Sequence, residues 1–255
     1  MPCLYSLSGT RRKRKAPAEL NALENIKNWK TATQHFASPF TKAHPEINAL
    51  ALSQLNPDLV ALASGSNMKI ILKSTGDTVA SLQGKGSQSK LITSIAFVPE
   101  QHMLCSASAD KTIKVWSADS DAADAKWSPG DTMTGHTDTV TSISIHPSGE
   151  LVLSTSLDGT WRLHSIASAF TVDAVQPEIG PLTRGALHPD GVLFAIGADS
   201  GKIVLYDIKE GSVAATFEGH GSAITSLAFS ENGFHFFLLL FSGWERAMLA
   251  LSFSC

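Results

Sequence analysis

Short hydrophobic runs separated by turns recur along most of the chain. The clearest stretch holds three runs rich in apolar and β-branched residues, Ile92–Val98, Met103–Ser108 and Thr112–Trp116. A proline turn separates the first two runs, and an Ala-Asp-Lys turn separates the second and third. Runs of this length with such turns between them are typical of consecutive antiparallel strands. We therefore predict a meander of short strands in this stretch.

The same template returns at a nearly constant interval. The last bulky residue of the first run recurs in steps of 45, 48, 42 and 42 residues, at Leu52, Phe97, Ile145, Leu187 and Phe229. The residue that closes the third run recurs in steps of 44, 48 and 42, at Leu72, Trp116, His164 and Tyr206. A period of about 40–45 residues with three or four strand-like runs per unit predicts a β-propeller.

The period divides the chain into three predicted parts. We expect a basic arm with a disordered or helical linker at 1–46, repeats at 47–233, and an aberrant apolar tail at 234–255. The predicted repeats are 47–90, 91–139, 140–180, 181–223 and a partial one at 224–233. The tail is apolar where a second strand should alternate, so we expect the strand rhythm to end at Gly233. The fold class is all-β, an incomplete propeller of about four to five blades.

Charge is distributed unevenly along the chain. The net charge is −3, but Arg11, Arg12, Lys13, Arg14 and Lys15 carry five of the 20 basic residues. The remainder has 15 basic against 23 acidic groups, a net of −8. A body that acidic is not expected to bind nucleic acid directly, since such binding depends on basic surface that displaces counterions.

The basic run itself predicts a nuclear localisation signal. Five consecutive Lys and Arg residues outside a folded domain are accessible to an acidic groove of a transport receptor. The alternatives are an RNA-contacting arm and a solvated charge cluster. We therefore predict that the protein is nuclear.

Cysteine usage and hydropathy give further expectations. The three cysteines have no CxxC spacing, and Cys105 lies in an apolar strand run, so we expect it to be a buried free thiol in a reducing compartment. No signal peptide is visible. The longest apolar run, Phe234–Phe241, is too short to span a bilayer, so no membrane association is expected.

No catalytic, cofactor or metal motif is visible. The sequence lacks GxSxG, HExxH, GxGxxG and P-loop patterns, and its nine histidines are scattered. The insertion 118–129 holds three aspartates but lacks the glycine and terminal glutamate of a calcium loop, so we expect a solvated loop. Catalytic, cofactor and metal residues are predicted to be absent. A propeller hydrolase remains the enzymatic alternative, and it would need convergent carboxylates or histidines at the central channel.

Several repeat positions resemble the WD40 repeat family. Gly-His pairs occur at residues 135–136 and 219–220, and one repeat closes in Lys-Val-Trp. The resemblance covers roughly 47–233. In that family an aspartate receives a hydrogen bond from the preceding Gly-His histidine, and only His136 with Asp158 retains both partners here. The residues that the resemblance marks as structural are His136, Asp158, Asp110, Trp116 and His220.

A longer string narrows the resemblance. The residues HPDGVLFAIGADSGKIVLYDIKEGSVAATFEGH and then ITSLAFSENG, preceded by the basic run, resemble the pre-mRNA-processing factor 19 family. The resemblance implies the spliceosome-associated nineteen complex, mRNA splicing, DNA repair, partners among spliceosomal proteins and ubiquitination substrates, and a propeller of seven blades. The family also has a ubiquitin-ligase U-box and a tetramerising coiled coil.

Neither the U-box nor the coiled coil can be matched to this sequence, so no ligase residue is carried over. We expect a truncated or mis-assembled product whose residues 234–255 are foreign to the family, with a protein-interaction and substrate-binding role. The alternative is a generic WD40 scaffold or a substrate receptor of another nuclear complex.

Overall fold

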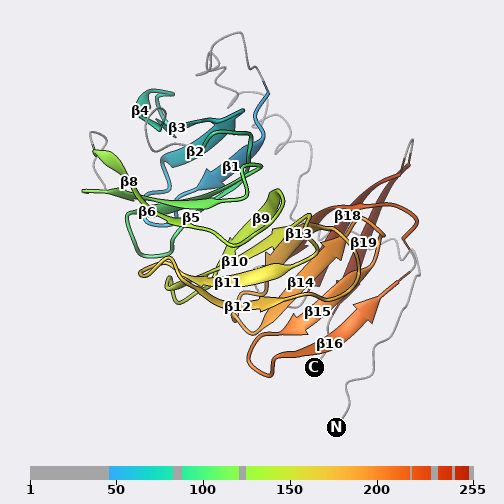
Figure 1. The fold of residues 1–255 in the computed structure, drawn as a ribbon. Coiled ribbons are helices and arrows are strands. Elements are labelled where there is room, and N and C mark those ends of the chain that lie inside the picture. The colour runs from blue at the N-terminus through green and yellow to red at the C-terminus, as the bar shows by residue number, and fades with distance from the viewer. Residues whose placement is uncertain are drawn as a thin grey trace. The chain divides into compact units, whose positions relative to one another are not determined.

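Nineteen strands build the described part of the chain (Figure 1). The computed structural model describes residues 46–82, 88–120, 125–218 and 220–230, and the backbone alone at 235–242 and 245–252. All of these belong to one unit, Pro39–Ser254. The strands are β1 Ala49–Leu52, β2 Leu59–Ser64, β3 Asn67–Leu72, β4 Thr78–Leu82, β5 Ile92–Phe97, β6 Met103–Ser108, β7 Ile113–Ala118, β8 Trp127–Met133, β9 Val140–Ile145, β10 Leu151–Ser156, β11 Trp161–Ser165, β12 Thr171–Val175, β13 Leu182–Leu187, β14 Leu193–Ala198, β15 Ile203–Asp207, β16 Ser212–Phe217, β17 Ile224–Phe229, β18 His235–Ser242 and β19 Glu245–Ser252.

Each sheet consists of strands that are consecutive in the chain. Four sheets have four antiparallel strands in the orders β1-β2-β3-β4, β5-β6-β7-β8, β9-β10-β11-β12 and β13-β14-β15-β16. The fifth has the order β17-β18-β19. The three runs that defined the repeat are β5, β6 and β7, so the predicted meander is confirmed.

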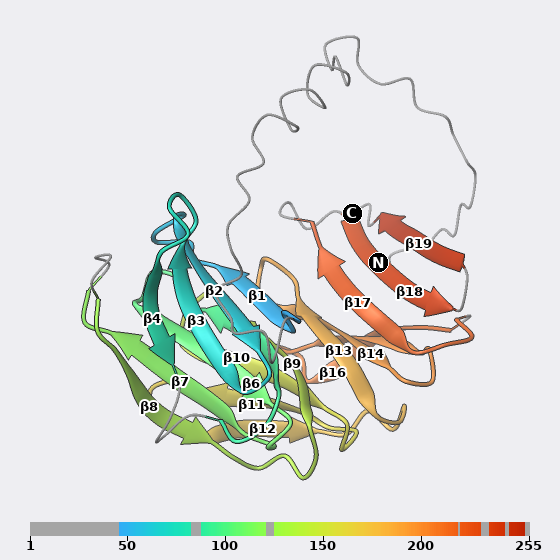
Figure 2. The same cartoon turned by 90° about the horizontal axis from the view of Figure 1, so that it is seen from above.

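First strands of successive sheets lie side by side. Strand β1 neighbours β5, β5 neighbours β9, β9 neighbours β13, and β13 neighbours β17. Strands β13 and β17 are labelled in Figure 2. The first and the fifth sheet share no strand pairing among the described residues. The fold is thus an incomplete β-propeller whose sheets do not close into a ring, as predicted.

The tail differs from the prediction. The strand rhythm does not end at Gly233, because β18 pairs along β17 and β19 pairs along β18, with His235 opposite Ser252 and Ser242 opposite Glu245. The reason lies in the second strand of each sheet. Strands β2, β10 and β14 are buried over most or all of their length, so a second strand in this fold need not alternate apolar and polar residues. The origin of this segment and the domain boundaries stay predictions.

One hydrophobic cluster fills each of the four interfaces between neighbouring sheets. Strand β6 packs against a neighbouring sheet on each of its two faces, so its residues are small or apolar on both. Leu104 belongs to the cluster shared with the first sheet, and Cys105 belongs to the cluster shared with the third. Cys105 is fully buried and free, as predicted, and burial raises the pKa of its thiol to about 12. A thiol with that pKa stays protonated and unreactive at neutral pH.

Threonine hydroxyls connect the first strands across the sheet interfaces. The hydroxyl of Thr93 donates to the carbonyl oxygen of Val140 at 2.5 Å. The hydroxyl of Thr141 donates to Leu182 at 2.9 Å, and that of Thr183 donates to Ile224 at 2.6 Å. Each threonine lies at the second position of its strand, and each acceptor is the first residue of the next one. These bonds tie successive sheets together in one repeated geometry.

Two other expectations concern connecting segments. The insertion 118–129 is only partly a loop, because β7 ends at Ala118 and β8 begins at Trp127. The carboxylate of Asp119 accepts the amide N–H of Lys126 at 2.9 Å and so closes this hairpin, while residues 121–124 lie outside the described residues. The linker predicted at 1–46 is likewise outside them, apart from Glu46. Within the described part of the chain, no helix is long and apolar enough to cross a membrane.

Candidate functional site

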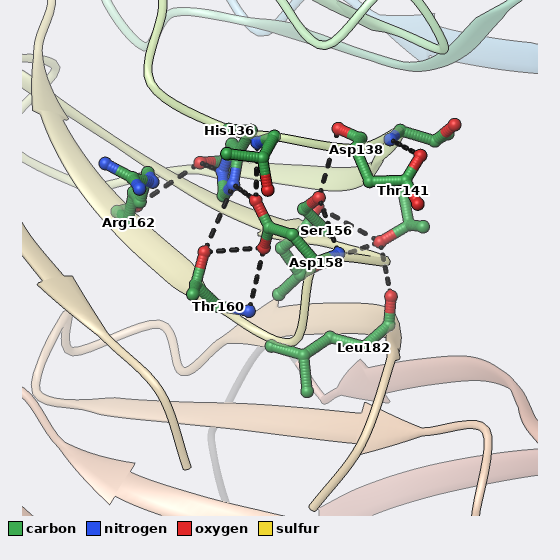
Figure 3. A network of polar contacts seen from close by, with 12 residues as sticks. His136, Asp138, Thr141, Ser156, Asp158, Thr160, Arg162 and Leu182 are labelled. Carbon is green, nitrogen blue, oxygen red and sulfur yellow. Dashed lines mark hydrogen bonds and ion pairs between the residues drawn. The ribbon is translucent and has the colours of Figure 1, made fainter. Parts of the chain in front are cut away.

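The densest group of polar side chains lies in the third sheet (Figure 3). His136 precedes β9, Ser154 lies on β10, and Asp158 lies in the turn between β10 and β11. The Nδ1 atom of His136 is 2.9 Å from a carboxylate oxygen of Asp158, and its Nε2 atom is 2.8 Å from the Ser154 hydroxyl. His136 is 7% exposed and Ser154 is fully buried. The structure thus brings together His136 and Asp158, which are 22 positions apart in the sequence.

Asp158 is held by several donors. The amide N–H groups of Thr137 and Thr160 donate to its two oxygens, each at 2.9 Å, and the Thr160 hydroxyl donates at 2.6 Å. Burial opposes ionisation of this carboxyl, but these bonds and the one from His136 outweigh it and lower the pKa of Asp158 to about 2. The ionised carboxylate of Asp158 therefore connects the turn between β10 and β11 to the segment that leads into β9.

The proton positions in this network follow from its acceptors. Because Asp158 only accepts, His136 carries its proton on Nδ1 and its Nε2 atom accepts the proton of Ser154. The Ser154 oxygen then accepts the Nε2 proton of His164 at 3.0 Å, and His164 Nδ1 accepts from Thr171 at 3.1 Å. All four bonds are satisfied with both imidazoles neutral. Burial lowers the pKa of both histidines and brings that of His164 to about 4.

This order of serine, histidine and aspartate is also that of an acyl-transfer triad. A nucleophile must reach its substrate, however, and Ser154 is fully buried with its oxygen already bonded to His164. The network therefore positions backbone segments rather than reacting atoms. Among the described residues, no three His, Cys, Asp or Glu side chains are grouped to hold a metal ion.

The second sheet carries a variant of the same arrangement. Asp110 accepts from the amides of Ser89 and Thr112 at 2.9 and 3.1 Å, and the Trp116 indole donates to the Ser106 hydroxyl at 2.9 Å. Gln88 occupies the place of the histidine, 22 residues before Asp110. Its amide nitrogen donates to the carbonyl oxygen of Ser106 at 2.8 Å, while its own oxygen is buried without a partner. Sequence reasoning missed Gln88, although the fixed spacing to the aspartate would have found it.

Replacing Gln88 by histidine is expected to stabilise the protein by about 1 kcal/mol. The imidazole would bridge Asp110 and Ser106 as His136 bridges Asp158 and Ser154, and it would remove the unpartnered amide oxygen. Urea unfolding of the full chain at pH 7.5 measures the change. Gln54→His, at an exposed position between β1 and β2, is the matched control. A Gln88→His protein less stable than the wild type would contradict the equivalence of the two sheets.

His164 predicts a loss of stability in mild acid. Its pKa is near 6.5 in an unfolded chain and about 4 here, so the unfolded state binds more protons between these values and stability falls as pH falls from about 6.5 to 4. The loss amounts to about 3 kcal/mol for this residue. His164→Trp removes the titration and supplies an indole donor to Ser154, as Trp116 supplies one to Ser106. The slope of unfolding free energy against pH should decrease markedly in this variant, and an unchanged slope would contradict the assignment.

His220 is not part of this network. It lies just before β17, at the corresponding place in the fifth repeat. Arg11, Arg12, Lys13, Arg14 and Lys15 lie outside the described residues, so the localisation signal stays a prediction.

Two hollows mark surfaces where a partner has room to bind. A groove of about 510 Å³ lies between the second and third sheets, lined by β6, β7, β8, β10 and the end of β11 with neighbouring turns. A smaller pocket of about 200 Å³ lies at the start of the first strands and is lined by Asn48, Leu91, Ile92, Thr93, Thr141 and Arg184. The smaller pocket has the larger share of polar residues in its lining.

The fold, the period and the network define the class of protein. The family model of the WD domain, G-beta repeat, matches residues 76–117, 127–165 and 211–244. The chain therefore contains WD40 repeats, which build an incomplete propeller. The third match extends into β18, which agrees with the strand found there.

The similarity to individual proteins is more specific. The chain is 28% identical over 236 residues to pre-mRNA-processing factor 19 homolog 2 of Arabidopsis thaliana, covering 91% of this chain and 43% of the relative. It is 31% identical over 223 residues to pre-mRNA-processing factor 19 of Mus musculus and of Homo sapiens, covering 86% of this chain and 42% of each relative. The resemblance to pre-mRNA-processing factor 19 is thus confirmed for the part with WD40 repeats. The chain spans about two fifths of the length of these relatives.

Proposed function

We propose that this chain is a protein-docking region that serves pre-mRNA processing in the nucleus. The observation that carries the proposal is the similarity to pre-mRNA-processing factor 19 over about nine tenths of the chain. The fold supports it, because propellers present loops from successive sheets on a rigid frame and bind through those loops. The polar network supports it as well, since its groups are consumed in fixing the turns and leave no accessible nucleophile.

The finer parts of the proposal come from the family resemblance. The partners would be proteins of the spliceosome and of the nineteen complex, with ubiquitination substrates and a role in DNA repair among them. Any ligase activity would reside in parts of such an assembly other than the residues named here. The contribution of this chain would be recognition alone.

Quantitative affinity capture tests the docking role. The full chain with an affinity tag is incubated with nuclear extract, and bound proteins are compared by mass spectrometry with those on an unrelated WD40 propeller. Enrichment of pre-mRNA splicing proteins on this chain alone is expected. Equal recovery on both propellers would overturn the proposal.

Nuclear import depends on the basic run if the localisation prediction is right. The full chain fused to two copies of a fluorescent protein, to slow passive entry, should accumulate in nuclei. Changing Arg11, Arg12, Lys13, Arg14 and Lys15 to alanine should distribute it evenly, because the acidic receptor groove then lacks its ligand. Changing Lys90, Lys111 and Lys126 to alanine is the matched control and should leave the nuclear signal unchanged. Unaltered accumulation of the first variant would refute the prediction.

A further inference from the structure

The first strands of the five sheets carry a threonine followed by a serine, and three residues depart from this rule. At the position of the bridging threonines the repeats have Asn48, Thr93, Thr141, Thr183 and Thr225. At the next position they have Ala49, Ser94, Ser142, Arg184 and Ser226. Asn48 and Arg184 are the departures that introduce N–H donors. They come from the first and the fourth sheet, 136 residues apart in the chain, yet both line the pocket of about 200 Å³.

Two backbone carbonyl oxygens hold the side chain of Arg184 in place. Its Nε atom donates to the carbonyl oxygen of Thr225 at 2.8 Å, and one terminal nitrogen donates to the carbonyl oxygen of Thr183 at 2.8 Å. The other terminal nitrogen, Nη2, has no hydrogen bond to any described residue. A guanidinium group anchored on one edge presents its remaining N–H groups in a fixed direction.

Asn48 is oriented in the same way. Its side-chain oxygen accepts the amide N–H of Gly65 at 2.8 Å, which leaves the amino group of the side chain directed away from that bond. The amino group makes no hydrogen bond to another described residue. The threonine hydroxyls of the pocket are already committed, because Thr93 and Thr141 donate to the carbonyl oxygens of the next strand. The donors that the pocket leaves unused are therefore those of Arg184 and Asn48.

The charge around the pocket is unbalanced. None of the residues that line it carries a carboxylate, and Arg184 makes no ion pair with a described residue. Arg184 is exposed to solvent, and desolvation of the covered part of its side chain lowers the pKa of its guanidinium group. An anion that enters the pocket would supply the missing charge and accept the unused N–H groups. The volume is below the roughly 300–1,000 Å³ of sites for small molecules, so it is suited to a single side chain.

We propose that this pocket binds an acidic side chain of a protein partner, with Arg184 and Asn48 donating to a carboxylate or to the phosphate of a phosphorylated serine. The proposal rests on the docking role proposed above and names the chemistry of one contact within it. The other residues of the partner segment would lie over the first residues of β5, β9 and β13.

Binding of peptide libraries tests the pocket. Fluorescently labelled nonapeptide libraries with a fixed central glutamate, phosphoserine, glutamine or lysine are titrated with the full chain, and anisotropy is recorded. The glutamate or the phosphoserine library should bind, and the glutamine and lysine libraries should not. Comparing the two acidic libraries shows which of the anions is preferred.

Three variants locate the binding. Arg184→Ser and Asn48→Thr each restore the residue found in other repeats, so the fold accommodates both. Arg184→Ser should weaken binding of the acidic libraries at least about tenfold, and Asn48→Thr should weaken it several-fold. Lys90→Ser, which removes a charge beside the pocket without altering its lining, should have no effect. Urea unfolding checks that all three variants are folded. If Arg184→Ser does not fold, the binding measured with Asn48→Thr decides the test.

Three results would overturn the proposal. One is equal affinity for the glutamate, phosphoserine and glutamine libraries. Another is the same loss of affinity in Lys90→Ser as in Arg184→Ser. The third is Arg184-dependent binding of a single-stranded RNA oligonucleotide with no binding of the acidic libraries, which would assign the pocket to nucleic-acid phosphates. The capture from nuclear extract is scored separately, so splicing proteins recovered by a chain that ignores acidic peptides would refute the pocket and retain the docking role.

Discussion

Gly201→Ala is expected to destabilise the protein by about 3 kcal/mol or more. Gly201 lies in the turn between β14 and β15 with a φ of +80°, a conformation that costs an L-residue about 1–2 kcal/mol. An added Cβ would lie 2.3 Å from the carbonyl oxygen of His220 and 2.9 Å from that of Ser222. Both atoms belong to the backbone that leads into β17, so the clash is relieved only by moving a segment of the fifth repeat. Urea unfolding of the full chain measures the loss.

Gly211→Ala is the matched control for this prediction. Gly211 also has a positive φ, +66°, but nothing lies within 4 Å of its added Cβ. The expected loss is therefore the conformational part alone, about 1 kcal/mol. The difference between the two variants measures the contact between the fourth and fifth repeats. Equal losses would mean that this contact does not form in solution.

Asp158→Ala is expected to cost about 3–5 kcal/mol, because several hydrogen-bond donors lose their acceptor and each buried one costs about 1–3 kcal/mol. The carboxylate accepts from two backbone amides, one hydroxyl and the His136 ring, and its side chain is 6% exposed. Removing it leaves the buried His136 ring and the half-buried donors of Thr160 without an acceptor, and it also frees His136 to turn away from Ser154. The turn between β10 and β11 would then lose its connection to the segment before β9.

Asp138→Ala serves as the control for Asp158. Asp138 is in the same connecting segment, is exposed, and accepts through its side chain only from the amide of Thr139 at 2.7 Å. Its replacement should change the unfolding free energy by less than about 1 kcal/mol. Should both aspartates prove equally dispensable, the network would not be a stabilising element of the third sheet.

The strand pattern was predictable from the sequence because its cause is local. Each short apolar run ends in a turn residue, and the repeated spacing identifies the unit without any knowledge of contacts. The strands of the tail were not predictable in this way, because an alternation of apolar and polar residues is the wrong criterion for a strand that is covered on both faces. The same burial explains why Leu104 and Cys105 are both apolar although they point to opposite sides of the sheet.

The site was only partly predictable. His136 and Asp158 followed from the family resemblance, whereas Ser154 and His164 gain their roles from hydrogen bonds that the sequence does not display. Gln88 was missed because the expected signal was a Gly-His pair, whereas the feature that the repeats share is a fixed number of residues before the aspartate. Arg184 stands out only when the first strands are compared position by position, and its proximity to Asn48 arises from the packing of the sheets.

Hydrogen exchange of the full chain, followed by mass spectrometry, tests the tandem arrangement of sheets most directly. Peptides from β6, β10 and β14, which pair with a strand on both sides and are buried over most of their length, should exchange much more slowly than peptides from the outer strands β8, β12 and β16. Protection should therefore rise and fall once in every repeat. Equal exchange in inner and outer strands would contradict the account, because no such layering of the sheets would then exist.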